Sequence, residues 1–394
     1  MTVHAQTALG SRLALAAAVA AVILYGSLYP FGFSDTGPFT ADVTHLLGTW
    51  HQPPQSRGDL LANLVLYAPL GLAIMLVLER VASRFLALIL TVLAGAVLSL
   101  AVELTQFYDA SRVSVLSDVY LNIAGSLGGA IIGWAGGWGL EKASWPHGSA
   151  PAFARLLLLA WLGWRLYPYV PVIDLHKYWH AVRPLLSAAP LTPFNVFRYA
   201  TLWLCVSFLL QAGFRPARPL LWLFWMIAAF FAAKILVVGQ YMSREEIFGA
   251  LTALVLDGVF FRRYPKIGTP ALAALLLVLV VLLRVLPWNP SASLKQFQWI
   301  PFFGFLHGSL QVNLISSCEK FCTYGLLILL LTASGMRLVA ATALACMMLL
   351  ATSALETLEV GRSAEVTDAV LALACGVVYA LLKRWDGGAA RRPT

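Results

Sequence analysis

Long apolar runs with almost no charge are the feature that most restricts what this chain can fold into. Examples are residues 13–29, 86–102, 220–238 and 271–286. A helix that crosses a bilayer needs about 20 mostly apolar residues, and a transmembrane strand needs an alternation that these runs lack. Of all residues, 60% are hydrophobic and 11% are charged, whereas soluble domains carry about 25% charged residues. The sequence therefore predicts an all-α, polytopic transmembrane helix bundle.

An apolar run that ends in a proline turn occurs three times, as Leu28-Tyr29-Pro30-Phe31, Leu166-Tyr167-Pro168-Tyr169 and Val285-Leu286-Pro287-Trp288. An arginine after the third run of each unit also recurs, as Arg112, Arg244 and Arg362. Two markers with similar periods predict a triplicated four-helix unit, and so about 12 membrane helices. Because the first helix recurs later in the chain, it is not expected to be a cleaved signal peptide.

The predicted units are residues 1–140, a degenerate copy at 150–265 and a further copy at 268–386, followed by a basic tail at 387–394. The expected helices are 12–29, 60–78, 85–106, 118–138, 153–167, 195–212, 219–239, 246–261, 270–286, 313–332, 338–356 and 365–382. Each unit has a long loop between its first two helices, at 30–59, 168–194 and 287–312.

The net charge of +9 is better explained by the orientation of the protein in the membrane than by binding to nucleic acid. Basic residues gather in the short loops of one side, as Arg80, Arg84, Arg215, Arg218, Arg262, Arg263, Lys266, Arg337 and the C-terminal tail. By the positive-inside tendency this side is the cytoplasm. We expect a protein of the cell membrane (inner or plasma) with both termini cytoplasmic, in contact with membrane lipids and not with nucleic acid.

The first unit carries two polar motifs. One is Gly58-Asp59-Leu60-Leu61-Ala62-Asn63 followed by Tyr67-Ala68-Pro69-Leu70-Gly71; the other is Glu103-Leu104-Thr105-Gln106 followed by Arg112, Asp118, Asn122 and Gly125. Over residues 20–138 these motifs resemble the two signatures of the VanZ-like family. The family is named after a membrane protein linked to resistance against the glycopeptide teicoplanin. The resemblance implies a place in the cell envelope more than a particular reaction.

The third unit is similar to a diverged copy of the first. Its matching residues are Asn313, Glu319-Lys320-Phe321, Tyr324-Gly325, Glu356, Glu359, Arg362 and Asp368. It departs from the motif in having Glu359 at the position of Gln106 and Ala372 at that of Asn122. The middle unit lacks the motif acids at the aligned positions.

Helical spacing groups the polar residues of the first unit. Glu103 with Gln106, Asp118 with Asn122, and Asp59 with Asn63 each share a helix face, and Arg112 lies between two acidic helix ends. Two interpretations stay open: a structural polar cluster, worth about 0.6 kcal/mol per bond, or a site for a headgroup or ion. The candidate substrate-binding residues are Arg112, Glu103, Gln106, Asp118, Asn122, Asp59, Asn63, Arg362, Glu356, Glu359, Asp368 and Lys320.

The leading functional hypothesis is a membrane protein that binds or translocates an amphipathic envelope substrate: a lipid, a lipid-linked sugar or a lipophilic glycopeptide. Arg112 and Arg362 would hold its anionic group. The alternatives are a membrane enzyme acting on an envelope lipid, with Glu103 or Glu356 as general base, and a structural partner in an envelope polysaccharide complex. No catalytic motif supports an enzyme. Cys318 and Cys322 are better explained as buried thiols than as metal ligands with His307, so no metal or cofactor is expected.

Overall fold

The described part of the chain is helical. The computed structural model describes residues 3–28, 31, 33, 39–51, 57–109, 114–139, 148–171, 174–291, 293–304 and 310–389. Across these residues there are helices and isolated β-bridges but no named strand. Six helices are long and apolar enough to cross a membrane, namely Arg84–Gln106, Pro193–Phe214, Pro219–Leu236, Pro265–Val285, Ile315–Ala333 and Leu338–Leu358. The prediction of an all-α membrane helix bundle is confirmed.

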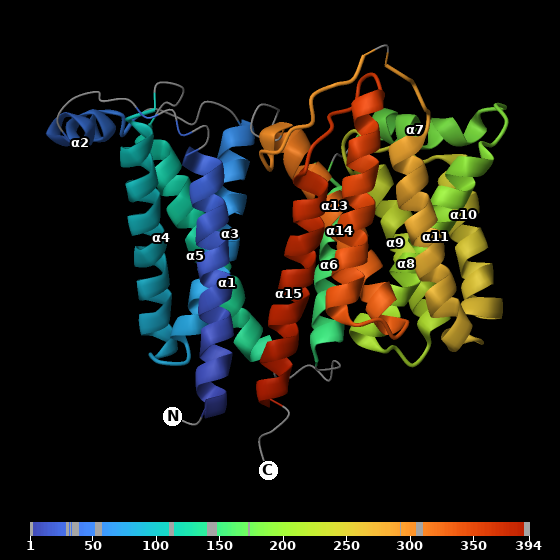
Figure 1. Cartoon of the computed structure of the whole chain (residues 1–394), viewed down its shortest axis with the longest axis horizontal. Coiled ribbons are helices and arrows are strands. Elements are labelled where there is room, and N and C mark those ends of the chain that lie inside the picture. The colour runs from blue at the N-terminus through green and yellow to red at the C-terminus, as the bar shows by residue number, and fades with distance from the viewer. Residues whose placement is uncertain are drawn as a thin grey trace. The chain divides into compact units, whose positions relative to one another are not determined.

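The chain forms two compact units. The first comprises residues 1–144, 308–311 and 384–394, and the second comprises 145–307 and 312–383. The helices of residues 1–144 are α1 (Val3–Leu28), α2 (Phe39–Gly48), α3 (Arg57–Leu78), α4 (Arg84–Gln106) and α5 (Leu116–Gly139). The later helices are α6 (Ser149–Arg165), α7 (Leu175–Val182), α8 (Pro193–Phe214), α9 (Pro219–Leu236), α10 (Arg244–Leu256), α11 (Pro265–Val285), α13 (Leu310–Ala333), α14 (Leu338–Leu355) and α15 (Thr367–Ala389). Figure 1 labels them.

Each predicted membrane span coincides with one of these helices, and the described part of the chain also contains the short helices α2 and α7. Both lie in segments that we predict as long loops. In α7 the carboxylate of Asp174 accepts a hydrogen bond of 2.9 Å from the backbone N–H of His176, which caps the helix at its start. The helix has only eight residues, too few to produce a strong periodic pattern.

Close packing of α3 on α5 holds the first unit together. The glycines Gly71 and Gly129 touch the backbone of Ser126 and Ala68, so that an added Cβ at either position would overlap a carbonyl oxygen. Small residues let membrane helices approach closely where no hydrophobic effect draws them together. Gly95 of α4 contacts the side chain of Ser126 in the same way, so all three helices meet at this serine.

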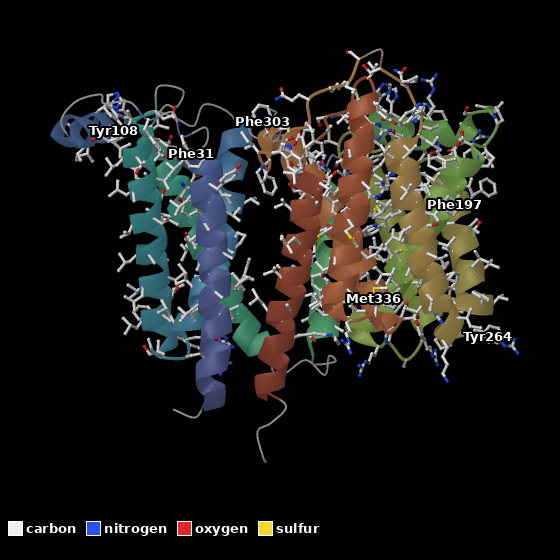
Figure 2. The ribbon with its side chains drawn as sticks, viewed as in Figure 1. Phe31, Tyr108, Phe197, Tyr264, Phe303 and Met336 are labelled. Atoms are coloured by element: carbon white, nitrogen blue, oxygen red, sulfur yellow. The ribbon has the colours of Figure 1, made fainter. Side chains whose placement is uncertain are left out.

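One apolar core fills the second unit. Its buried residues come from both the predicted middle unit and the predicted third unit, and the ring of Phe153 stacks on that of Tyr379 with centroids 4.7 Å apart. Within this unit α7 and the loop before α13 lie at one end of the helices, and the turns after α8, after α10 and before α14 lie at the other (Figure 1). Tyr264 and Met336 mark the second end in Figure 2, and Phe303 lies towards the first.

Candidate functional site

One backbone connection occurs three times. The residue three positions after the proline of each turn forms an isolated bridge with the segment that follows the third long helix: Phe33 with Asp109, Pro171 with Val237, and Pro290 with Glu359. In the two later copies a neighbouring backbone hydrogen bond also recurs, from Val238 N to Val170 O at 3.0 Å and from Val360 N to Asn289 O at 2.9 Å. The bridges let the three four-helix segments be compared position by position.

Burial supports this comparison. Seven positions before the bridge, Val102, Phe230 and Thr352 are all buried. Fourteen positions before it, the buried residues are Gly95, Leu223 and Ala345. Equivalent positions therefore face the interior in all three segments.

A side chain three positions after the bridge binds the backbone carbonyl just before the proline. Arg362 donates to the carbonyl of Leu286 at 2.8 Å, and Gln240 donates to that of Tyr167 at 2.6 Å. Arg362 also donates to the carbonyl of Leu283 at 3.2 Å, and its Nε lies 2.6 Å from the carboxylate of Glu359. All three guanidinium nitrogens of Arg362 are thus engaged within the protein.

The residue equivalent to Arg362 in the first segment is Arg112, which lies outside the described residues. In the middle segment the structure places Gln240 at this position, and not Arg244, whose side chain donates to the carbonyl of Ala189. The comparison also aligns Glu359 with Asp109, three positions later than Gln106.

A buried ion cluster surrounds Arg284 in the second unit. The guanidinium pairs with Asp368 and, at 3.0 Å, with Glu356. Further hydrogen bonds of 2.7 Å reach the hydroxyls of Thr352 and Ser353. Lys320 binds the other carboxylate oxygen of Asp368 at 2.6 Å. Three predicted site residues, Glu356, Asp368 and Lys320, are therefore brought together around Arg284, which is not among the predicted site residues.

The middle segment contains an equivalent ion cluster. Arg165 pairs with Glu246, which also binds Lys234 at 2.6 Å. Arg165 and Arg284 each lie three positions before the proline, and Glu246 and Asp368 each lie nine positions after the bridge. The prediction that the middle unit lacks the motif acids is therefore wrong for this position, because Glu246 is equivalent to Asp368. The prediction failed because it aligned the units on Arg244.

The first segment arranges its motif residues differently. Ser27 stands three positions before the proline, and its carbonyl accepts a hydrogen bond of 2.7 Å from the side chain of Gln106. Glu103 is 3% exposed and accepts a hydrogen bond of 3.2 Å from the backbone N–H of Val115. These bonds join α4 to the ends of α1 and α5.

Other motif residues of the first segment are placed as follows. The side-chain amide of Asn122 donates to the hydroxyl of Ser99 at 2.9 Å, and both residues are buried. Asp118 and Asn63 are half-buried. The side chain of Asp59, like Arg112, lies outside the described residues, so the predicted position of Arg112 between two acidic helix ends stays a prediction.

A family model described as VanZ/LLP1 matches residues 13–136. This range contains both polar motifs and runs from α1 to α5. Residues 13–136 form a VanZ-like domain. Searches of curated proteins and of solved structures found no match to the chain.

One polar pair sets the VanZ-like domain apart from the rest of the chain. Ser99 lies ten positions before the bridge and Asn122 thirteen positions after it. The equivalent pairs are Ile227 with Ala250 in the middle segment and Leu349 with Ala372 in the third. The position that is polar in the VanZ-like domain is therefore apolar in both other segments.

Two apolar grooves lie along helices of the second unit. One, of about 520 Å³, runs between α8, α10 and α11, and the other, of about 510 Å³, runs between α14 and α15. Among the described residues, no charged side chain lines either groove, so the grooves suit hydrocarbon chains and not a headgroup. In the described part of the chain no three His, Cys, Asp or Glu side chains are grouped as metal ligands.

Proposed function

We propose that this membrane protein binds an amphipathic envelope substrate (a lipid, a lipid-linked sugar or a lipophilic glycopeptide) through its VanZ-like domain. The observation that carries the proposal is the Ser99–Asn122 pair one turn from Glu103. Polar groups buried in membrane helices are costly, so they need either a structural or a functional reason. Because two other segments of this chain fill the same position with apolar side chains, the four-helix architecture does not need the polar pair.

The third segment is less suited to hold the substrate. An arginine that holds an anion in a bidentate manner needs two free N–H groups. Arg284 has none, because its five N–H groups point at Asp368, Glu356, Thr352, Ser353 and Tyr324. Arg362 already uses three of its five N–H groups to hold Glu359 and two backbone carbonyls. These contacts support a positioning role for the third-segment motif residues and favour Glu103, Ser99 and Asn122 as the substrate contacts.

The leucine–alanine pair of the third segment offers a direct test. We expect the double variant Ser99→Leu with Asn122→Ala to fold. The amount of envelope lipid or glycolipid that copurifies with it should fall by a factor of about ten or more, because a buried polar contact is lost. Native mass spectrometry of protein purified from the same membranes measures this. Thr91→Val is the matched control, since the Thr91 hydroxyl bonds only its own helix at Ala87. Unchanged ligand on a folded double variant would contradict the proposal.

We also propose that the protein lies in the cell membrane with its short basic turns in the cytoplasm. In the second unit the turns with Arg215 and Arg218, with Arg262 and Arg263, and with Arg337 lie at the end opposite α7 (Figure 1). Lys and Arg are enriched in cytoplasmic loops. By the same tendency both termini are cytoplasmic, and the long loops face outward.

Cysteine labelling tests this orientation. On a background without the five native cysteines, Leu294→Cys should react with an impermeant maleimide in intact cells, because Leu294 is exposed in the outward loop. Lys266→Cys should react only after permeabilisation. The reverse pattern would place the basic turns outside.

A further inference from the structure

Arg198 of α8 and Glu319 of α13 are two opposite charges of the second unit that do not meet. Within the described residues neither side chain forms an ion pair or a side-chain hydrogen bond, and the Nε atom of Arg198 is buried without an acceptor. By contrast, Glu246, Glu356 and Asp368 each bind a cation directly. The pair therefore stands outside the ion clusters of this unit.

The two charges nevertheless share one region. The guanidinium of Arg198 lies 5.8 Å from the ring centroid of Tyr199, and that of Arg165 lies 5.7 Å from the same ring. On α13, Cys318 lies against Gly163 of α6, which places the neighbouring Glu319 at the level of Arg165 at the end of α6. Glu246 already binds Arg165, and Asp368 already binds Lys320. Arg198 and Glu319 are therefore the two charged side chains of this region that are available to a ligand.

Their chemistry specifies that ligand. Opposite charges attract strongly where water is scarce. Arg198 and Glu319 cannot simply move together, because their helices are held in the core through Leu204 and Cys322. A ligand that brings an anion to the arginine and a cation to the carboxylate satisfies both. Arginine prefers phosphate, and a carboxylate accepts hydrogen bonds from a primary ammonium group.

We propose that Arg198 and Glu319 bind a phosphoethanolamine headgroup, with the phosphate on Arg198 and the ammonium on Glu319. The headgroup belongs to a membrane phospholipid or to free glycerophosphoethanolamine. This site lies in the second unit and does not depend on the function proposed for the VanZ-like domain.

Native mass spectrometry of the full-length protein with phosphatidylethanolamine, phosphatidylglycerol or phosphatidylcholine of equal chain length tests the proposal. The wild type should bind phosphatidylethanolamine at least about tenfold more tightly than the other two, since each lacks a primary ammonium. Glu319→Gln should abolish this preference, and Arg198→Gln should weaken binding of all three. Arg337→Gln, at an exposed arginine, should bind as the wild type does.

Competition separates the two ligand sources. Displacement by free glycerophosphoethanolamine assigns the site to the headgroup alone, and persistence of the bound lipid assigns it to the intact phospholipid. If Arg198→Gln does not fold, Arg198→Lys replaces it, with weakened phosphate binding expected. Equal binding of the three lipids by the wild type, or unchanged preference in folded Glu319→Gln, overturns the proposal. The Ser99→Leu, Asn122→Ala variant should keep the phosphatidylethanolamine preference, so the two proposals can fail separately.

Discussion

Replacing Arg284 by glutamine is expected to destabilise the protein by about 3–5 kcal/mol, the usual cost of removing one partner from a buried ion pair. Arg284 binds the carboxylates of Glu356 and Asp368 and three hydroxyls, those of Thr352, Ser353 and Tyr324. Glutamine is too short and neutral, so Glu356 would remain buried without its cation, while Asp368 would keep only Lys320. The folding equilibrium should shift by between roughly a hundredfold and a few thousandfold.

Equilibrium unfolding in mixed micelles, followed by tryptophan fluorescence, measures this free energy. Arg337→Gln is the control, because Arg337 is exposed and its side chain has no partner in the described part of the chain. Adding Glu356→Gln to Arg284→Gln should recover part of the loss, since it removes the carboxylate left without a cation. A free energy of unfolding within about 0.5 kcal/mol of the wild type, the range of ordinary surface substitutions, would contradict the role assigned to Arg284.

The long helices could be predicted from the sequence because a bilayer imposes one strong requirement. Each span must be long, apolar and hydrogen-bonded within itself, so the runs around Leu98 or Leu276 are visible without any tertiary information. The short helices α2 and α7 could not be predicted in this way. They arise from local capping, as at Asp174, and from packing at the ends of the bundle.

The site residues were only partly predictable for a different reason. Spacing shows which residues share a helix face, and the similarity of the third unit to the motifs of the first identified Glu356 and Asp368. Their common partner Arg284 is 84 positions from Asp368 along the chain, and no spacing rule connects them. Glu246 was missed because Arg244 suggests a register four residues away from that of the bridge at Val237.

The second large effect is expected at Arg362, and it should depend on Glu359. Glu359 is 2% exposed at its side chain and its charge is balanced by Arg362. Arg362→Gln leaves this carboxylate buried without a cation, at a cost of about 3 kcal/mol. Gln240 shows that a glutamine at this position can still bind the carbonyl before the proline, so the loss should come from the stranded charge and not from the lost arginine contacts.

The middle segment supplies the compensating change. It has Val237 where the third has Glu359, and both backbones are extended there, with φ and ψ of −90° and 135° for Val237 and −110° and 142° for Glu359. Valine therefore fits the bridge at position 359 without strain. We expect the double variant Arg362→Gln with Glu359→Val to return to within about 1 kcal/mol of the wild type, because replacing a whole buried pair is often nearly neutral.

The same micelle unfolding measurement, applied to both single variants and the double variant, gives the coupling energy between the two positions. Glu359→Val alone should cost about 1 kcal/mol, since Arg362 is 26% exposed and keeps two carbonyl acceptors, and lost hydrogen bonds are individually modest. A coupling of about 3–4 kcal/mol follows from these values. Additive losses would mean that position 359 tolerates an uncompensated charge, and the equivalence of the middle and third segments at these positions would then be wrong.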